Sequence, residues 1–507
     1  MISRTRCERL INFLYGEVDY DEMPRIMWLS ALLCAIIGGF WLLDSLKDTV
    51  LATTVGLEYQ PRAKVLSVCV TLIVVSIYNG LIDRVSKPAL FYAIGFTYFI
   101  LFVILGGCLA HRSFGMENTS PDPHRLLGWF TYFAIESYGS LAVALFWAFT
   151  NASIDLESAK SSYGLIVAFA QLGAIFGSTL ATKASAFHIS FLFVLGGSSC
   201  LLVCAMVRGY EIFFMIPAQI LPAHPSENTT QQSANKIRSN VHLFDGISLV
   251  LRHGYVTSLL AISTLYEVIL TVLDFEMKII GRARYSTDER GAEQFAELMG
   301  HFGQTVNTIS FIFSLAGFSY VVRRLGLSIT LLVFPFLLIV GTLVTYASPG
   351  LWTLFITTAL LKALTYSLNE PALEMLYVPT SEPIKFKAKA WIDVVGARSA
   401  KAAGSAINDF VQRSPYLRTN LPQYGNVPAL LVSIILLAVS AHVGSRFESL
   451  VEDGHIVGEQ KPNSHLYRSG GDHRGSYELI TRLASSRSED DDDAKSIFGA
   501  IARENNR

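Results

Sequence analysis

The sequence has few charged residues for its length. Of its 507 residues, 16% are Asp, Glu, Lys or Arg, whereas an ordinary soluble domain carries about 25%. Apolar residues make up 51% of the chain, and its mean hydropathy is +0.41. A soluble protein of this length could not hide so much apolar surface from water. The composition therefore excludes an ordinary soluble protein and favours one that lies in a membrane.

Several motifs that mark enzymes and ion-dependent folds are also absent. The dipeptide Gly-Lys never occurs, so the chain lacks the G-x-x-x-x-G-K-[ST] loop that cradles phosphates for hydrolysis, and it contains neither G-x-G-x-x-G nor H-E-x-x-H. The six cysteines do not form a disulfide framework, because five of them sit in apolar runs and Cys7 stands alone near the start. We therefore expect a protein that is not an enzyme, with no cofactor and no metal. Any transport would be driven by a gradient and not by hydrolysis.

The charge balance excludes another class of partner. Lys and Arg number 40 against 41 Asp and Glu, which gives a formal net charge of -1. Proteins that bind nucleic acids are usually basic, or carry a basic face. We expect no nucleic-acid partner.

Long apolar runs dominate what is present. A helix needs about 20 apolar residues to cross a bilayer. The first half of the chain contains six such runs: Met27 to Leu43, Ala63 to Leu81, Ala89 to Ala110, Leu127 to Thr150, Tyr163 to Ala181 and Ile189 to Val207. The second half contains five: Val256 to Leu273, Val306 to Val322, Leu327 to Ala347, Leu351 to Leu368 and Val427 to His442.

We count one further span, Ala388 to Val411, although hydropathy alone would reject it. It is rich in Ala and Gly but carries four charged residues, and charges at membrane depth are tolerated only in pairs or facing a water-filled cavity. The expected fold is therefore all-α, a polytopic membrane protein with about 12 transmembrane helices in two six-helix bundles. Such a layout is typical of secondary transporters, whose site lies at the midplane between the bundles.

This interpretation divides the chain into five parts. They are a cytoplasmic N-terminal segment (1–26), an N-terminal bundle (27–207), a central cytoplasmic linker (208–255), a C-terminal bundle (256–447) and a polar, disordered C-terminal tail (448–507). Lys and Arg near the span ends place both termini in the cytoplasm. Residues 1–26 lack an apolar core and are acidic, which argues against a signal or transit peptide. Self-contained bundles favour a monomer.

Charged residues at membrane depth are the candidates for the site. Lys47 and Asp48 lie near the end of the first span, Glu136 lies in the fourth and Glu267 in the seventh. The eleventh span adds Lys389, Asp393, Arg398 and Lys401, and Lys362 in the tenth is a further lysine for which a structural role competes. Lys47 could instead snorkel to the membrane interface. Each half therefore offers a deep acid and at least one base.

These charges predict an anionic substrate. A cavity with a surplus of Lys and Arg suits phosphates, for which Lys acts as a point charge and Arg as a planar fork. Lys64, at the start of the second span, would extend this basic lining. Acids would repel phosphates unless they were paired, so Asp48 and Asp393 are interpreted as gate or pairing residues. Lys389 and Asp393, four residues apart, are expected to form an ion pair.

At these residues the sequence resembles a known family. Its motifs are Leu46-Lys-Asp-Thr49, Glu136-Ser-Tyr-Gly-Ser140 leading to Phe146-Trp-Ala-Phe-Thr-Asn151, Glu267-Val268, Glu374-Met-Leu-Tyr-Val-Pro379, and Lys387 to Arg398 followed by Lys401. In this order, from about residue 25 to 445, they are similar to those of the nucleotide transporter family, the ATP/ADP translocases of plastids, obligate intracellular bacteria and microsporidian parasites. The resemblance implies a major-facilitator-like arrangement of the two bundles.

The resemblance also implies a function and a set of residues. Members of that family exchange ATP for ADP or carry other nucleotides across a lipid bilayer. Their recurrent charged positions carry over to Lys47, Glu136, Glu267 and Lys401. Substrate contacts are then expected from these four together with Arg398, Lys389 and Lys64. The expected location is the cell membrane of an intracellular parasite or an organelle membrane, with a plastid envelope less favoured.

The sequence departs from the family at three places. Leu373 and Thr271 stand where the family commonly has lysines, and Ala400-Lys-Ala-Ala-Gly404 replaces its Gly-Lys-Ser-Gly-Gly. The loss of these lysines makes the surface that would bind phosphate less basic, and this leaves two alternatives open. One is a proton-linked importer of nucleoside triphosphates or other nucleotides, and the other is a transport-inactive nucleotide sensor or scaffold. ATP:ADP antiport by alternating access is the leading prediction.

Overall fold

The computed structural model of the protein describes residues 22–82, 84–153, 156–215, 243–285, 290–316, 318–381, 383–414 and 421–458. Within these ranges the chain is helical, and its one β-type contact is an isolated bridge between Thr380 and Val457. The prediction of an all-α fold is confirmed. The predictions for most of the N-terminal segment, the middle of the linker and most of the tail lie outside the described residues.

The first half of the chain folds around a central helix. Its long helices are α2 (Met23–Thr54), α3 (Gln60–Ile82), α4 (Lys87–Leu109), α5 (Leu126–Ser153), α6 (Leu156–Ala181) and α8 (Ile189–Tyr210), with the short elements η1 (Leu57–Tyr59), α7 (Ala184–Phe187) and η2 (Glu211–Met215) between or after them. Helix α2 packs against α5, α6 and α8. From Ile26 to Leu43 it carries no charged residue on any side, as expected for a helix surrounded by others, and its charged residues follow in the later turns.

The second half contains the broken helices. Its elements are α11 (Leu243–Arg252), α12 (Gly254–Arg284), α13 (Gly291–Ala316), α14 (Phe318–Ala347), α15 (Leu351–Leu364), η3 (Thr365–Asn369), α16 (Glu370–Met375), η4 (Ile384–Ala388), α17 (Lys389–Trp391), η5 (Ile392–Gly396), α18 (Ala397–Arg413) and α20 (Leu421–Glu452). Helix α12 packs against α15, α18 and α20. The π-helical turns η3, η4 and η5 interrupt the tenth and eleventh expected spans, and such turns are frequent at functional sites.

The helices match the expectation of a multi-pass membrane protein. In the described part of the chain, 9 helices are long and apolar enough to cross a membrane, and α6 contains a shorter apolar stretch, Leu165–Ala181. Large apolar side chains such as Ile73, Ile77 and Phe176 remain more than half exposed, which is tolerable only where lipid covers them. The remaining spans of the predicted twelve, α13 and the segment from α17 to α18, carry too many polar residues to pass this test.

The eighth span begins earlier than hydropathy predicts. The apolar run suggested Val306 to Val322, but α13 covers Gly291–Ala316, and Val322 belongs to α14. The start of α13 holds polar residues that hydropathy excludes. Glu297 accepts a hydrogen bond from the backbone of Ser185 at 3.1 Å, and Gln304 donates to Thr179 at 3.1 Å. These side chains face the other half of the protein and not lipid, which is why the hydropathy of this stretch misleads.

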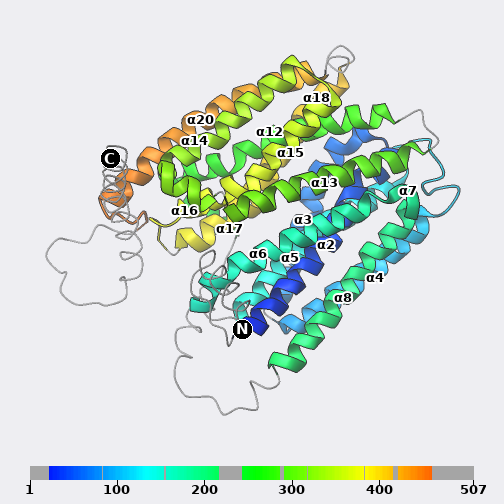
Figure 1. Cartoon of the computed structure of the whole chain (residues 1–507), viewed down its shortest axis with the longest axis horizontal. Helices are drawn as coiled ribbons and strands as arrows, with labels where there is room; N and C mark the ends of the chain where they lie inside the picture. Colours follow the sequence, from blue (N-terminus) through cyan, green and yellow to red (C-terminus); the bar gives the residue numbers. More distant parts are fainter. Residues whose placement is uncertain are drawn as a thin grey trace, which may run out of the picture.

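The two halves meet at one end of the molecule, as Figure 1 shows. We call the end where α2 begins and α8 ends the near end, and the end where α2 and α12 end the far end. The halves pack through α6 against α13, α3 against α18, and α2 against α13. At the far end a side chain on Gly300 would lie 2.7 Å from the backbone nitrogen of Thr182, so glycine lets α13 approach this closely.

Glu276 lies in the interior of the second half, where its buried side chain is expected to lower the stability of the protein. Its side chain is 0% exposed, and neither carboxyl oxygen has a hydrogen-bond partner among the described residues. A buried polar group without a partner costs about 1–3 kcal/mol. We therefore expect Glu276→Met to raise the melting temperature of the detergent-solubilised protein. Asp274→Asn, two residues away, removes a carboxylate with two ion pairs and should lower it. A fall in melting temperature with Glu276→Met would contradict this account.

Candidate functional site

A cavity of about 290 Å³ lies between the two halves. Its walls come from α2, α3 and α5 on one side and from α12, α13, α15, η3 and α18 on the other. Five lysines and five acids line it: Lys47, Lys64, Lys278, Lys362 and Lys401, with Asp44, Asp48, Glu136, Glu267 and Asp274. A cavity built equally by both halves is where an alternating-access transporter holds its substrate.

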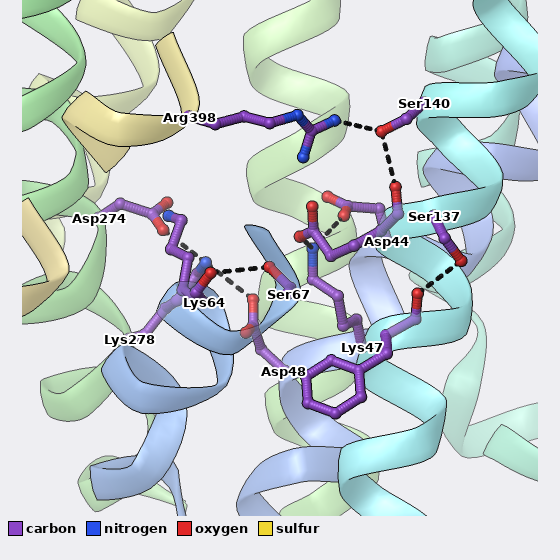
Figure 2. A network of polar contacts seen from close by, with 12 residues as sticks. Asp44, Lys47, Asp48, Lys64, Ser67, Ser137, Ser140, Asp274, Lys278 and Arg398 are labelled. Atoms are coloured by element: carbon purple, nitrogen blue, oxygen red, sulfur yellow. Dashed lines mark hydrogen bonds and ion pairs between the residues drawn. The ribbon is translucent and has the colours of Figure 1, made fainter. Parts of the chain in front are cut away.

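Lys47 is held by two carboxylates of its own half. Its Nζ atom lies 2.5 Å from Asp44 and 2.6 Å from Glu136, and it sits 5.0 Å above the ring of Tyr132. The side chain is 8% exposed. Figure 2 shows it pointing from α2 toward the carboxylate of Asp44. The interpretation of Lys47 as a snorkelling lysine is therefore wrong, and Glu136 is paired with a base.

The second half contains a looser pair. Lys401 on α18 lies 3.4 Å from Glu267 on α12, and its side chain is 43% exposed. The Lys47–Glu136 and Lys401–Glu267 pairs thus place an acid and a base from each half in the cavity wall, as the sequence predicts. The longer distance and greater exposure leave Lys401 more accessible than Lys47 to an incoming anion.

A third set of charges connects the halves. Lys278 on α12 lies 2.7 Å from Asp48 on α2 and 2.5 Å from Asp274 on its own helix, and Asp274 also lies 2.6 Å from Lys362 on α15. We call Asp48, Asp274, Lys278 and Lys362 the bridging cluster. Figure 2 shows Asp48 and Lys278 approaching each other from opposite sides of the cavity. The sequence predicts Asp48 as a gate or pairing residue but does not indicate its partner, which is Lys278.

Asp274 and Lys278 were missed by the sequence analysis. They lie just after the apolar run that ends at Leu273, in the last part of α12. Their spacing of four residues is a signal for an ion pair on one helix face, and it could have identified them. Nothing in the sequence indicates that Asp48 and Lys362 join them.

Lys64 differs from the other cavity lysines. It lies on α3, lines the cavity, and makes no ion pair with any residue that the structure describes. Figure 2 shows its side chain extending toward Asp274. An amine so placed is available to bind an anion without first giving up a partner.

Two expectations about the charged residues need correction. The lining holds equal numbers of lysines and acids, so it has no surplus of basic residues, because each half brings carboxylates that the sequence could not place. Arg398 lies outside the lining. Its guanidinium donates a hydrogen bond to Ser140 on α5, and this contact also links the halves.

The expected pair between Lys389 and Asp393 is also wrong. Lys389 lies 2.6 Å from Glu374, which the turn after α16 brings close, and Asp393 is exposed. Helical spacing cannot anticipate an acid that arrives from another element. Neither Lys389 nor Asp393 lines the cavity, so in this arrangement they do not contact a molecule bound there.

The sequence profile described as "TLC ATP/ADP transporter" matches residues 3–111, 129–352 and 348–443 of the chain. "ADP,ATP carrier protein 1" of Chlamydia pneumoniae is 25% identical over 449 residues, which cover 79% of this chain and 86% of that protein. "ADP,ATP carrier protein 3" of Rickettsia typhi is 22% identical over 448 residues, 78% of this chain and 88% of its own. The "Plastidic ATP/ADP-transporter" of Solanum tuberosum is 23% identical over 494 residues, which cover 88% of this chain and 76% of that protein.

Solved structures of other transporters share the fold. A bacterial homologue of the iron transporter ferroportin in an inward-facing state superposes with a TM-score of 0.58 at 14% identity, covering 84% of this chain and all 100% of that one. A peptide transporter POT superposes with a TM-score of 0.54 at 11% identity, covering 87% of this chain and 99% of that one. At such low identity the likeness concerns the fold alone, and it confirms the major-facilitator-like arrangement.

Proposed function

Because this chain belongs to the TLC ATP/ADP transporter family, we propose that it is a secondary transporter that exchanges ATP for ADP across a membrane by alternating access. The observation that carries the proposal is the cavity between the halves, which five lysines line. Lysine binds phosphate as a compact point charge with three donors. The relatives of C. pneumoniae, R. typhi and S. tuberosum carry names that refer to ADP and ATP.

The phosphates are proposed to bind between Lys64 and Lys401. Lys64 comes from the first half and has no ion-pair partner among the described residues, and Lys401 comes from the second half and holds Glu267 at 3.4 Å. A phosphate chain between them would draw the halves together from both sides. Lys47, held at 2.5 and 2.6 Å by two carboxylates, is proposed to order the cavity wall and to reach phosphate only when Asp44 or Glu136 releases it.

The balanced lining suits an exchanger. Of the five lysines and five acids that line the cavity, nine form ion pairs among the described residues, and Lys64 does not. Removing one partner of a buried pair leaves a charge uncompensated, which is costly. An incoming polyphosphate can replace protein carboxylates as the partner of the lysines. The displaced carboxylates then lose their partners, so binding of the polyphosphate is coupled to a rearrangement of the ion pairs in the cavity.

Counter-exchange in proteoliposomes tests this function. The purified protein is reconstituted into liposomes with or without internal ADP, and uptake of labelled ATP is measured. We expect internal ADP to accelerate uptake strongly, with protein-free liposomes as the control. Uptake that responds to an imposed pH gradient but not to internal ADP would contradict exchange and support a proton-linked importer. Binding of nucleotide without any uptake would identify a sensor.

A further inference from the structure

Two ion pairs at the far end connect the halves in the described part of the chain, and they differ in burial. Asp48 on α2 and Lys278 on α12 are 2.7 Å apart, with side chains 5% and 11% exposed. Arg62 on α3 and Asp409 on α18 are 2.8 Å apart, but the Arg62 side chain is 48% exposed. An exposed pair contributes little to stability, whereas breaking a buried one is costly. The Asp48–Lys278 pair therefore dominates the electrostatic closure of this end.

The geometry points to a role for this pair that goes beyond closure: we propose that the Asp48–Lys278 ion pair makes nucleotide exchange obligatory. The empty carrier stays closed at the far end because Asp48 holds Lys278, and a bound phosphate weakens that interaction. The inference rests on the proposed exchange function and assigns its strict dependence on counter-substrate to two named residues.

The positions of the two partners of Lys278 show which of its ion pairs must break when the far end opens. Lys278 is shared between Asp48 and Asp274. Asp274 belongs to the same helix, four residues away, and so moves with Lys278, whereas Asp48 belongs to the other half. When the halves separate at the far end, the ion pair with Asp48 must break and the ion pair with Asp274 can persist.

A phosphate in the cavity can compete with Asp48 for Lys278. Both residues line the same cavity as Lys64, so an anion held by Lys64 is close to the bridging cluster. Asp48 uses one oxygen for Lys278, and its other oxygen is buried with no hydrogen-bond partner in the part of the chain that the structure describes. Asp48 is thus held at the far end by one ion pair, and breaking that pair frees it. Without substrate nothing in the described cavity replaces Asp48, and the far end remains closed.

Asp48→Asn is the sharpest test, because it removes the pair between the halves while Lys278 keeps Asp274 as a partner. Proteoliposomes are loaded with labelled ATP, and efflux is measured into buffer with ADP and into nucleotide-free buffer. We expect the ratio of these two rates to be high in the parent and to fall by about tenfold in the variant, the typical effect of losing one charge-assisted hydrogen bond. Efflux without external nucleotide should rise.

Asp409→Asn is the matched control. It makes the same chemical change and also removes an ion pair between the halves at the far end, but this pair is exposed to solvent on its Arg62 side. Its efflux ratio should stay at the parental value. Equal falls in the ratio for Asp48→Asn and Asp409→Asn would overturn the proposal, because any loosening of the far end would then suffice.

Further outcomes distinguish this inference from the function on which it rests. A parent stimulated by ADP together with an unchanged ratio in Asp48→Asn would overturn the inference alone. A parent that ADP does not stimulate would overturn both. The double variant Asp48→Asn/Lys278→Gln removes the same pair without changing net charge, and gel filtration checks that each variant is folded. If Asp48→Asn does not fold, the same fall in the ratio is required of the double variant, and an unchanged ratio there would overturn the inference.

Discussion

Replacement of Lys64 by glutamine is expected to raise the nucleotide concentration required for half-maximal exchange about tenfold to a hundredfold. A hydrogen bond to a charged group contributes about 1.5–3 kcal/mol, which corresponds to that range in affinity. Lys64 makes no ion pair within the described residues, so its loss leaves no carboxylate without a partner. The melting temperature of the empty protein should therefore stay close to that of the parent. Exchange at varied ATP concentration and thermal unfolding in detergent measure the two effects.

Two further variants make this result specific to the charge of Lys64. Lys64→Arg keeps the positive charge but changes its geometry, and it should retain more affinity than Lys64→Gln. Lys183→Gln makes the same substitution at an exposed lysine that does not line the cavity, and it should behave as the parent. Unchanged exchange by Lys64→Gln at low ATP concentration would remove Lys64 from the phosphate site.

Replacement of Lys47 by glutamine is expected to have a different and larger effect, because it should destabilise the protein as well as abolish exchange. Asp44 and Glu136 would lose the amine that lies 2.5 and 2.6 Å from them. Breaking a buried ion pair by removing one partner costs about 3–5 kcal/mol, a large part of the stability of a typical domain. A marked fall in melting temperature, measured beside exchange activity, is the expected result.

A second substitution separates the structural role of Lys47 from binding of substrate. Lys47→Gln/Glu136→Gln removes one of the orphaned carboxylates, and it should recover part of the fall in melting temperature without regaining exchange. A Lys47→Gln protein that melts like the parent but exchanges poorly would contradict the structural role. Lys47 would then be a direct ligand of phosphate.

The helices of the first half could be predicted from sequence with few errors. A run of about 20 apolar residues can lie only in a membrane or a protein interior, and the runs in this half lie within α2, α3, α4, α5, α6 and α8, apart from one residue at the end of α4. The helices of the second half are harder to predict from the sequence. The start of α13 and the segment from η4 to α18 face the other half or the cavity. Their polar residues make the mean hydropathy of these segments too low to indicate a membrane span.

Sequence alone determined that this is a membrane protein, and it predicts Lys47, Glu136, Glu267 and Lys401 as charged residues of the membrane-spanning helices. The membrane assignment depends on composition and on the length of apolar runs, which are local properties of the chain. It required no knowledge of which helices are neighbours.

The tertiary structure alone decided which charges meet. Asp48 forms an ion pair with Lys278, Asp274 with Lys362, and Glu374 with Lys389. Lys64 has no ion pair among the described residues. An ion pair requires two groups within about 4 Å, and helices from distant parts of the chain reach that distance only through packing. Spacing along the sequence restricts partners on one helix, but it contains no information about the helix on the other side of the cavity.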